Sequence, residues 1–160
     1  MFRDILGAIE RSGAGEVVRT TPFLYPVLMS LHVLGIALLI GPAFIVDLRL
    51  LGLARGHVPV TVTMRHLLPL SHLGFGIVLC TGLPMFSAIA LAVGESPAAV
   101  WKFGLIVIAG FNILIFHQGI YKTVMTWDEE QTPPTSAKAA ALISMLCWTG
   151  TVFAGRFLAY

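Results

Sequence analysis

Four long apolar stretches dominate the chain, and shorter polar segments connect them. The stretches cover residues 22–46, 67–93, 99–121 and 140–160. Each reaches the length of about 20 apolar residues that a helix needs to cross a bilayer. Short connections favour antiparallel neighbours. The pattern therefore predicts an all-α integral membrane protein, an up-down bundle of four spanning helices that forms a single domain over residues 1–160.

The first 18 residues follow another pattern. Apolar side chains recur at the i, i+3, i+4 and i+7 positions Phe2, Ile5, Leu6 and Ile9. The charged residues Arg3, Asp4, Glu10 and Arg11 occupy other positions, which is typical of an amphipathic helix that lies in a membrane interface. We expect one short interfacial helix within residues 1–18, and we expect Gly13 and Gly15 to end it.

Composition agrees with a membrane protein. Of the 160 residues, 57% are hydrophobic and 11% are charged, whereas soluble domains carry about 25% charged residues. The formal net charge of +2 gives no reason to expect a nucleic-acid partner. The lipid bilayer is the expected partner. Both cysteines fall within predicted spans, and neither has CxxC or zinc-site spacing.

Four spans place both termini on one side of the membrane, called side A here; the opposite side is side B. The ten basic residues divide equally between the two sides. The connection over residues 47–66 concentrates three arginines. By the positive-inside rule, this concentration favours side B as the cytoplasmic side.

Five histidines provide the candidate chemistry, and four of them fall in or beside predicted spans: His32, His66, His72 and His117. His57 falls in the 47–66 connection, where we expect it to be solvated. With a rise of about 1.5 Å per residue, His117 lies roughly 7–8 Å from the midplane and His72 roughly 12 Å, both towards side B. Two imidazoles at similar depth on different helices match the axial ligands of a low-spin haem b. We predict His72 and His117 as its ligands.

Other residues fit a haem at this depth. Gly76 and Gly110 share the helix faces of the two histidines, where a glycine would leave room for the edge of a macrocycle. Arg65 and Lys122 lie on side B of the histidine pair. They could bind the two haem propionates through charge-assisted hydrogen bonds.

Other interpretations of the histidines stay open. An intramembrane histidine can simply hydrogen-bond a neighbouring helix. Imidazoles can also join cysteine or methionine in a copper(I) site, although Cys80 and the methionines, Met64 among them, do not share the predicted depth of the histidines.

His32 lies roughly 4–5 Å from the midplane towards side A. No histidine, methionine, cysteine or lysine shares this depth in the third and fourth spans. His32 could hold a metal alone, join the other pair through helix tilt, or handle protons near a bound quinone. Lys102 and Arg156, nearer side A, fit either snorkelling anchors or contacts to a propionate, a quinone or an anionic substrate.

Three segments are similar to small bacterial four-helix membrane proteins. LHVLGIALLIGPAFIVDLRLLG (31–52) resembles their first span, WKFGLIVIAGFNILIFHQG (101–119) resembles their tryptophan–lysine span, and AGRFLAY (154–160) resembles the ending of an uncharacterised family in that group. The better-known relatives are the HemJ-type protoporphyrinogen oxidases and the CopD-like copper-resistance proteins. The resemblance implies bound haem b, roles for His32 and Lys102, and a place in the bacterial inner membrane. The arginine distribution then favours periplasmic termini.

Four functional hypotheses follow. The first is a haem b protein that transfers electrons within the membrane, to or from a quinone or a partner redox enzyme, alone or as a homo-oligomer. The second is a haem-dependent oxidoreductase that acts on a porphyrinogen-like substrate, so the residues leave open whether the chain is itself an enzyme. The third is a copper-handling protein, and the fourth is a cofactor-free accessory subunit of a membrane complex.

Overall fold

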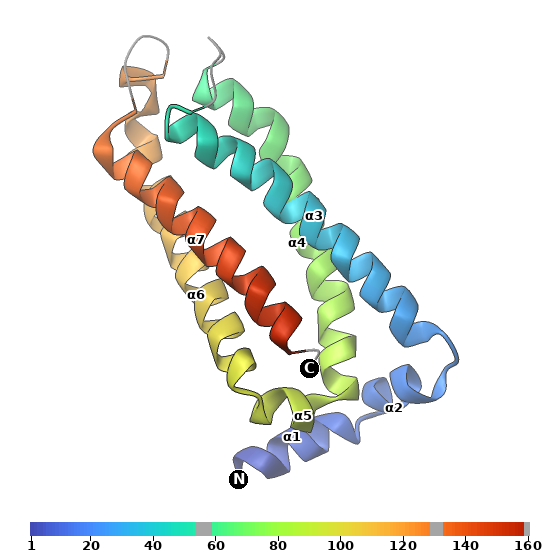
Figure 1. Cartoon of the computed structure of the whole chain (residues 1–160). Helices are drawn as coiled ribbons and strands as arrows, with labels where there is room; N and C mark the ends of the chain where they lie inside the picture. Colours follow the sequence, from blue (N-terminus) through green and yellow to red (C-terminus); the bar gives the residue numbers. More distant parts are fainter. Residues whose placement is uncertain (54–58, 129–132, 159–160) are drawn as a thin grey trace.

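The computed structural model describes residues 1–53, 59–128 and 133–158, and within them all regular secondary structure is helical. The four longest helices are α3 (Leu24–Leu50), α4 (Val60–Ala88), α6 (Pro97–Gln118) and α7 (Thr135–Phe157). Each is long and apolar enough to cross a membrane. They run alternately up and down, and α1 and the last turn of α7 lie towards the same end of the bundle (Figure 1). The predicted all-α four-helix membrane bundle is confirmed.

The long helices pack as two pairs. α3 lies along α4 and α6 lies along α7, while α7 also touches α3 (Figure 1). In the described part of the chain, α4 and α6 do not pack closely against each other. Gly74 explains the close approach of the first pair, because a Cβ atom there would meet backbone atoms of Leu38 and Gly35 at 2.7 and 2.8 Å. Such small residues let membrane helices pack at short distance.

The helix ends differ from the predicted spans. α4 begins at Val60, not at residue 67, so part of the predicted 47–66 connection, including His66, is helical. Pro59 precedes α4 and Pro97 opens α6, where a missing N–H costs the helix nothing. α4 ends at Ala88, and the short helix α5 (Ala90–Glu95) occupies most of the stretch before α6. His57 and Arg55 lie outside the described residues.

Two helices, not one, form the N-terminal segment. α1 covers Phe2–Glu10 and α2 covers Gly13–Thr20. The prediction that Gly13 and Gly15 end a single helix was wrong, because the Ser12 hydroxyl accepts a hydrogen bond from the Gly15 N–H at 3.4 Å and caps a second helix there.

These two helices lie against the side A ends of α4 and α5. Glu10 accepts a hydrogen bond from the Leu91 N–H at 2.8 Å, and Arg19 donates one to the Ala88 carbonyl at 3.0 Å. Leu6 is buried, whereas Phe2 remains exposed. The segment therefore covers one end of the bundle and keeps apolar side chains on its outer surface.

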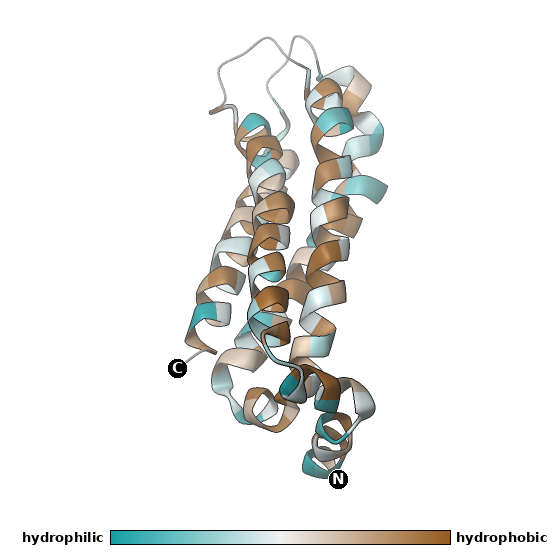
Figure 2. Cartoon of the chain, turned by 90° about the vertical axis from the view of Figure 1, so that its right-hand side faces the viewer, coloured by the Kyte–Doolittle hydropathy of each residue, from teal (hydrophilic) through white to brown (hydrophobic). Residues whose placement is uncertain are grey.

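Hydrophobic residues occupy much of the length of the long helices, as the brown ribbon segments show (Figure 2). Leu34, Leu83, Phe111 and Phe153 are each at least 60% exposed. Apolar groups on this scale require an apolar surrounding, which supports the multi-pass membrane placement. The largest buried cluster lies towards side B, where all four long helices and the 3₁₀ helix η1 (Ile120–Thr126) contribute to it.

Candidate functional site

A cavity of about 450 Å³ lies between α4 and the end of α6 with η1. We call it the histidine cavity, because it contains both histidines that the sequence paired by depth. Its lining residues are Thr61, Met64, Arg65, Leu68, Pro69, His72, His117 and Tyr121. The volume lies in the range of about 300–1,000 Å³ that is typical of small-molecule sites.

The α4 wall of this cavity follows from helical spacing. Arg65, Leu68, Pro69 and His72 stand at i, i+3, i+4 and i+7, so they share one face. Pro69 has no N–H, so the Arg65 carbonyl loses its usual helical donor at this wall. His72 presents an exposed imidazole, and no described residue hydrogen-bonds either of its ring nitrogens. His66 lies outside the lining and bonds the Val62 carbonyl at 2.8 Å.

His117 is held in a defined orientation on the opposite wall. Its Nδ1 lies 2.9 Å from the Ile113 carbonyl oxygen. A carbonyl only accepts, so Nδ1 carries a proton, and in the neutral imidazole the lone pair is on Nε2. The rings of Phe116 and Tyr121 lie against the imidazole, with centroid distances of 5.5 and 5.8 Å. His117 therefore has one nitrogen bound to its own helix and the other available to a ligand.

The structure brings some of the predicted haem contacts together and leaves others apart. Arg65 lines the histidine cavity, whereas Lys122 is exposed on η1 and does not. A Cβ atom at Gly76 or Gly110 would meet nothing within 4 Å, but neither glycine lines the cavity. Met64 lines it, although the depth comparison had separated Met64 from the histidines. The cavity reaches Met64 because α4 begins earlier than predicted and its side B turns form part of the lining.

His32 lies in a different environment. It is buried between α3 and α4, and its Nδ1 is 2.8 Å from the Thr81 hydroxyl oxygen. That hydroxyl donates to the Ile77 carbonyl at 2.7 Å, so Nδ1 of His32 must be the donor to Thr81. The structure therefore places His32 outside the lining of the histidine cavity. The sequence did not identify Thr81 as the partner of His32, because the depth of His32 was compared only with residues of the third and fourth predicted spans.

Lys102 and Arg156 lie towards side A. The Lys102 Nζ atom is 3.7 Å from the position that a Cβ of Gly155 would take on α7. Arg156 is exposed on α7 and does not line the histidine cavity.

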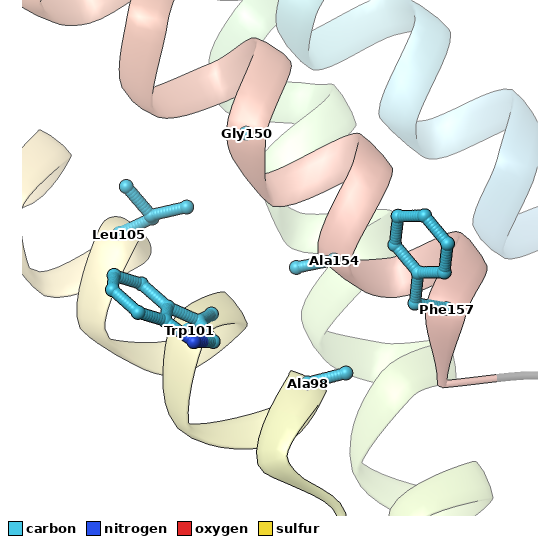
Figure 3. Close-up of a pocket in the computed structure, with 6 residues that line it drawn as sticks. All are labelled: Ala98, Trp101, Leu105, Gly150, Ala154 and Phe157. Carbon is cyan, nitrogen blue, oxygen red and sulfur yellow. The ribbon is translucent and has the colours of Figure 1, made fainter.

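A second cavity of about 400 Å³ lies between α6 and α7 towards side A. Figure 3 shows Trp101 and Leu105 on α6 beside Gly150, Ala154 and Phe157 on α7. Apolar and small residues line it, so it can take an apolar ring or chain. It offers no acid, base or metal ligand from these side chains.

The comparisons with known proteins give the family but no activity. No curated protein and no solved structure was found to match the chain. The sequence profile of a family of unknown function (DUF6644) matches residues 6–160, and the chain therefore belongs to that family.

Proposed function

We propose that this protein binds haem b in the histidine cavity, with His72 and His117 as axial ligands, and transfers electrons within the membrane. One observation carries the proposal: two imidazoles from different helices line one cavity. When bound, haem supplies one-electron chemistry, and the protein sets ligand identity, hydrogen bonding and burial.

The donor set of the cavity fits this cofactor. His117 presents Nε2 because Nδ1 is bonded to Ile113, and such a bond fixes the tautomer and orientation of a ligating imidazole. Arg65 places a cation in the same cavity, where it can bind a propionate by charge-assisted hydrogen bonds. Leu68 and Tyr121 add apolar surface for a flat ring.

The resemblance to the HemJ-type and CopD-like group supports two refinements of the proposal. Like the HemJ-type proteins, this chain would bind haem. In the enzymatic form of the proposal, the chain is an oxidoreductase that acts on a porphyrinogen-like substrate. In the electron-transfer form, the donor or acceptor is a quinone or a partner redox protein. The apolar cavity beside Trp101 is large enough for part of a quinone.

Copper(I) handling is the second candidate function, because Met64 lines the same cavity as the two imidazoles. Thioether and imidazole ligands suit copper(I). This proposal makes Met64 essential, whereas bis-histidine haem ligation does not. Met64→Leu, which nearly conserves volume, therefore separates the two candidates.

Spectroscopy of the purified protein tests the haem proposal. The protein is expressed with haem supplementation, purified in mild detergent, and measured oxidised and after dithionite reduction. We expect the absorption of a low-spin haem b, lost in both His72→Ala and His117→Ala. His66→Ala is the matched control, because His66 is also on α4 but does not line the cavity.

Three results would overturn the assignment. Absence of a Soret band in folded, haem-supplemented protein would remove haem from the proposal, and copper bound only with Met64 present would replace it. A haem lost in His32→Ala but kept in His72→Ala would move the ligand site to the α3–α4 interface.

A further inference from the structure

Asp47 is a buried carboxyl group without a full set of partners. It lies in the last turn of α3 and is only 6% exposed. Its Oδ2 atom has no hydrogen-bond partner among the described residues. Nearly all buried polar atoms in proteins are hydrogen-bonded, so an orphaned carboxylate oxygen calls for a physical cause.

The surroundings of Asp47 disfavour a negative charge. The carboxyl is buried beside the Ser144 side chain of α7, and burial disfavours its charged form. Arg49 stands two residues along α3, and residues at that spacing do not face each other on a helix; Arg49 also has an interaction of its own. Asp47 lies at a helix C-terminus, where the free carbonyls already form a negative end.

We propose that Asp47 is a proton-binding site between α3 and α7, and that its carboxyl carries a proton in the folded protein. A proton on the carboxyl removes the cost of burying a charge. It also turns the orphaned oxygen into a hydroxyl donor, and the Ser144 hydroxyl, only 8% exposed, can serve as acceptor. Proton and serine together make the α3–α7 contact neutral and hydrogen-bonded.

This site is separate from the histidine cavity. Asp47 does not line that cavity, and the inference does not depend on haem or copper. A monovalent cation is the competing ligand, but it would need several oxygen ligands around this carboxyl.

A hydrophobic carbodiimide tests the proposal, because it adds to a protonated carboxyl and remains on the protein as an N-acylurea. Full-length protein in mild detergent is treated at neutral pH, digested and mapped by mass spectrometry. We expect the adduct on Asp47 and its loss in Asp47→Asn. Asp128 is the matched control: it is 8% exposed, but both of its carboxylate oxygens accept hydrogen bonds from Thr61, so we expect no adduct there.

Infrared spectroscopy provides a second readout that needs no reagent to reach Asp47. We expect the carbonyl stretch of a protonated carboxylic acid in the wild type, shifted in heavy water and absent in Asp47→Asn. Neither adduct nor acid carbonyl band in folded wild type would overturn the proposal. Labelling that sodium suppresses and choline does not would replace the proton with a cation.

Discussion

His32 lies where two helices pack tightly, whereas His72 and His117 lie where two helices leave a cavity. Around His32, α3 and α4 approach until a Cβ atom on Gly82 would lie 2.9 Å from the imidazole. Around the other two histidines, α4 and α6 leave a cavity of about 450 Å³. The first imidazole is buried and bonded to Thr81. The other two face a space that a ligand can enter.

This difference shows what distinguishes a structural histidine from a candidate ligand in this bundle. All three residues are polar groups in apolar helices, and depth in the membrane alone does not show which of them is free to bind a ligand. The packing does: His32 gives its Nδ1 proton to a neighbouring helix, whereas His117 gives its Nδ1 proton to its own helix and turns Nε2 outwards. Substitutions near His32 and substitutions near the histidine cavity should therefore have different effects.

Gly74→Val should produce the largest effect, because it disrupts the close packing of α3 against α4. The new side chain would collide with the backbone of α3 at Leu38 and Leu39. We expect a loss of about 3 kcal/mol or more in the free energy of unfolding, the upper end of overpacking costs. Unfolding in mixed micelles, followed by circular dichroism, measures it.

Gly76→Val is the control for this substitution, since it adds the same side chain two residues along the same helix. A Cβ atom there would meet nothing within 4 Å. Equal losses in the two variants would show that helix propensity, not the α3–α4 contact, sets the cost.

Thr81→Val should have the next largest effect. It keeps the shape of the side chain but removes the acceptor of the His32 Nδ1 proton, which is buried. An unsatisfied buried donor costs about 1–3 kcal/mol, so we expect the unfolding free energy to fall by about 2 kcal/mol. Thr81→Ser keeps the hydroxyl and should recover most of the loss. If serine is no better than valine, the hydrogen bond does not stabilise the interface.

The all-α architecture was predictable from the sequence because it depends on composition and length. Apolar stretches of sufficient length leave a membrane helix as the simplest structure. The helix starts were less predictable, because they depend on single local interactions. Ser12 caps a second N-terminal helix, and α4 extends back to Val60 through residues that are polar enough to be taken for a loop.

The candidate site was predictable only in part for the same reason. Depth along a helix follows from the rise per residue, so His72 and His117 could be paired from the sequence. The direction in which a side chain points between helices depends on which helices pack together. The periodicity of this sequence does not predict that pairing. Thr81 beside His32 and Met64 in the cavity therefore became visible only in the structure.

Asp128→Ala tests whether the contact between Asp128 and Thr61 holds the wall of the histidine cavity in place. Asp128 follows η1 and accepts hydrogen bonds from the backbone N–H and the hydroxyl of Thr61, which lies in the first turn of α4 and lines the histidine cavity. Loss of a helix N-terminal acceptor costs about 0.5–2 kcal/mol. We expect a loss near 1 kcal/mol in unfolding free energy together with faster loss of haem from the cavity.

Asp128→Asn is the control for this substitution, because the amide oxygen can still accept one of the Thr61 bonds. It should fall between wild type and alanine in both measurements. Haem loss that is equal in wild type and Asp128→Ala would mean that the contact stabilises the helix end without shaping the cavity.

Gly110→Ala should have the smallest effect, and with the opposite sign. A Cβ atom there would meet nothing within 4 Å, and alanine is favoured over glycine inside a helix by about 0.5–1 kcal/mol. We expect a slightly higher unfolding free energy for the haem-free protein. Because Gly110 does not line the histidine cavity, we also expect unchanged haem content. A more stable protein that binds less haem would show instead that the macrocycle extends along α6 to Gly110, as the sequence alone had predicted.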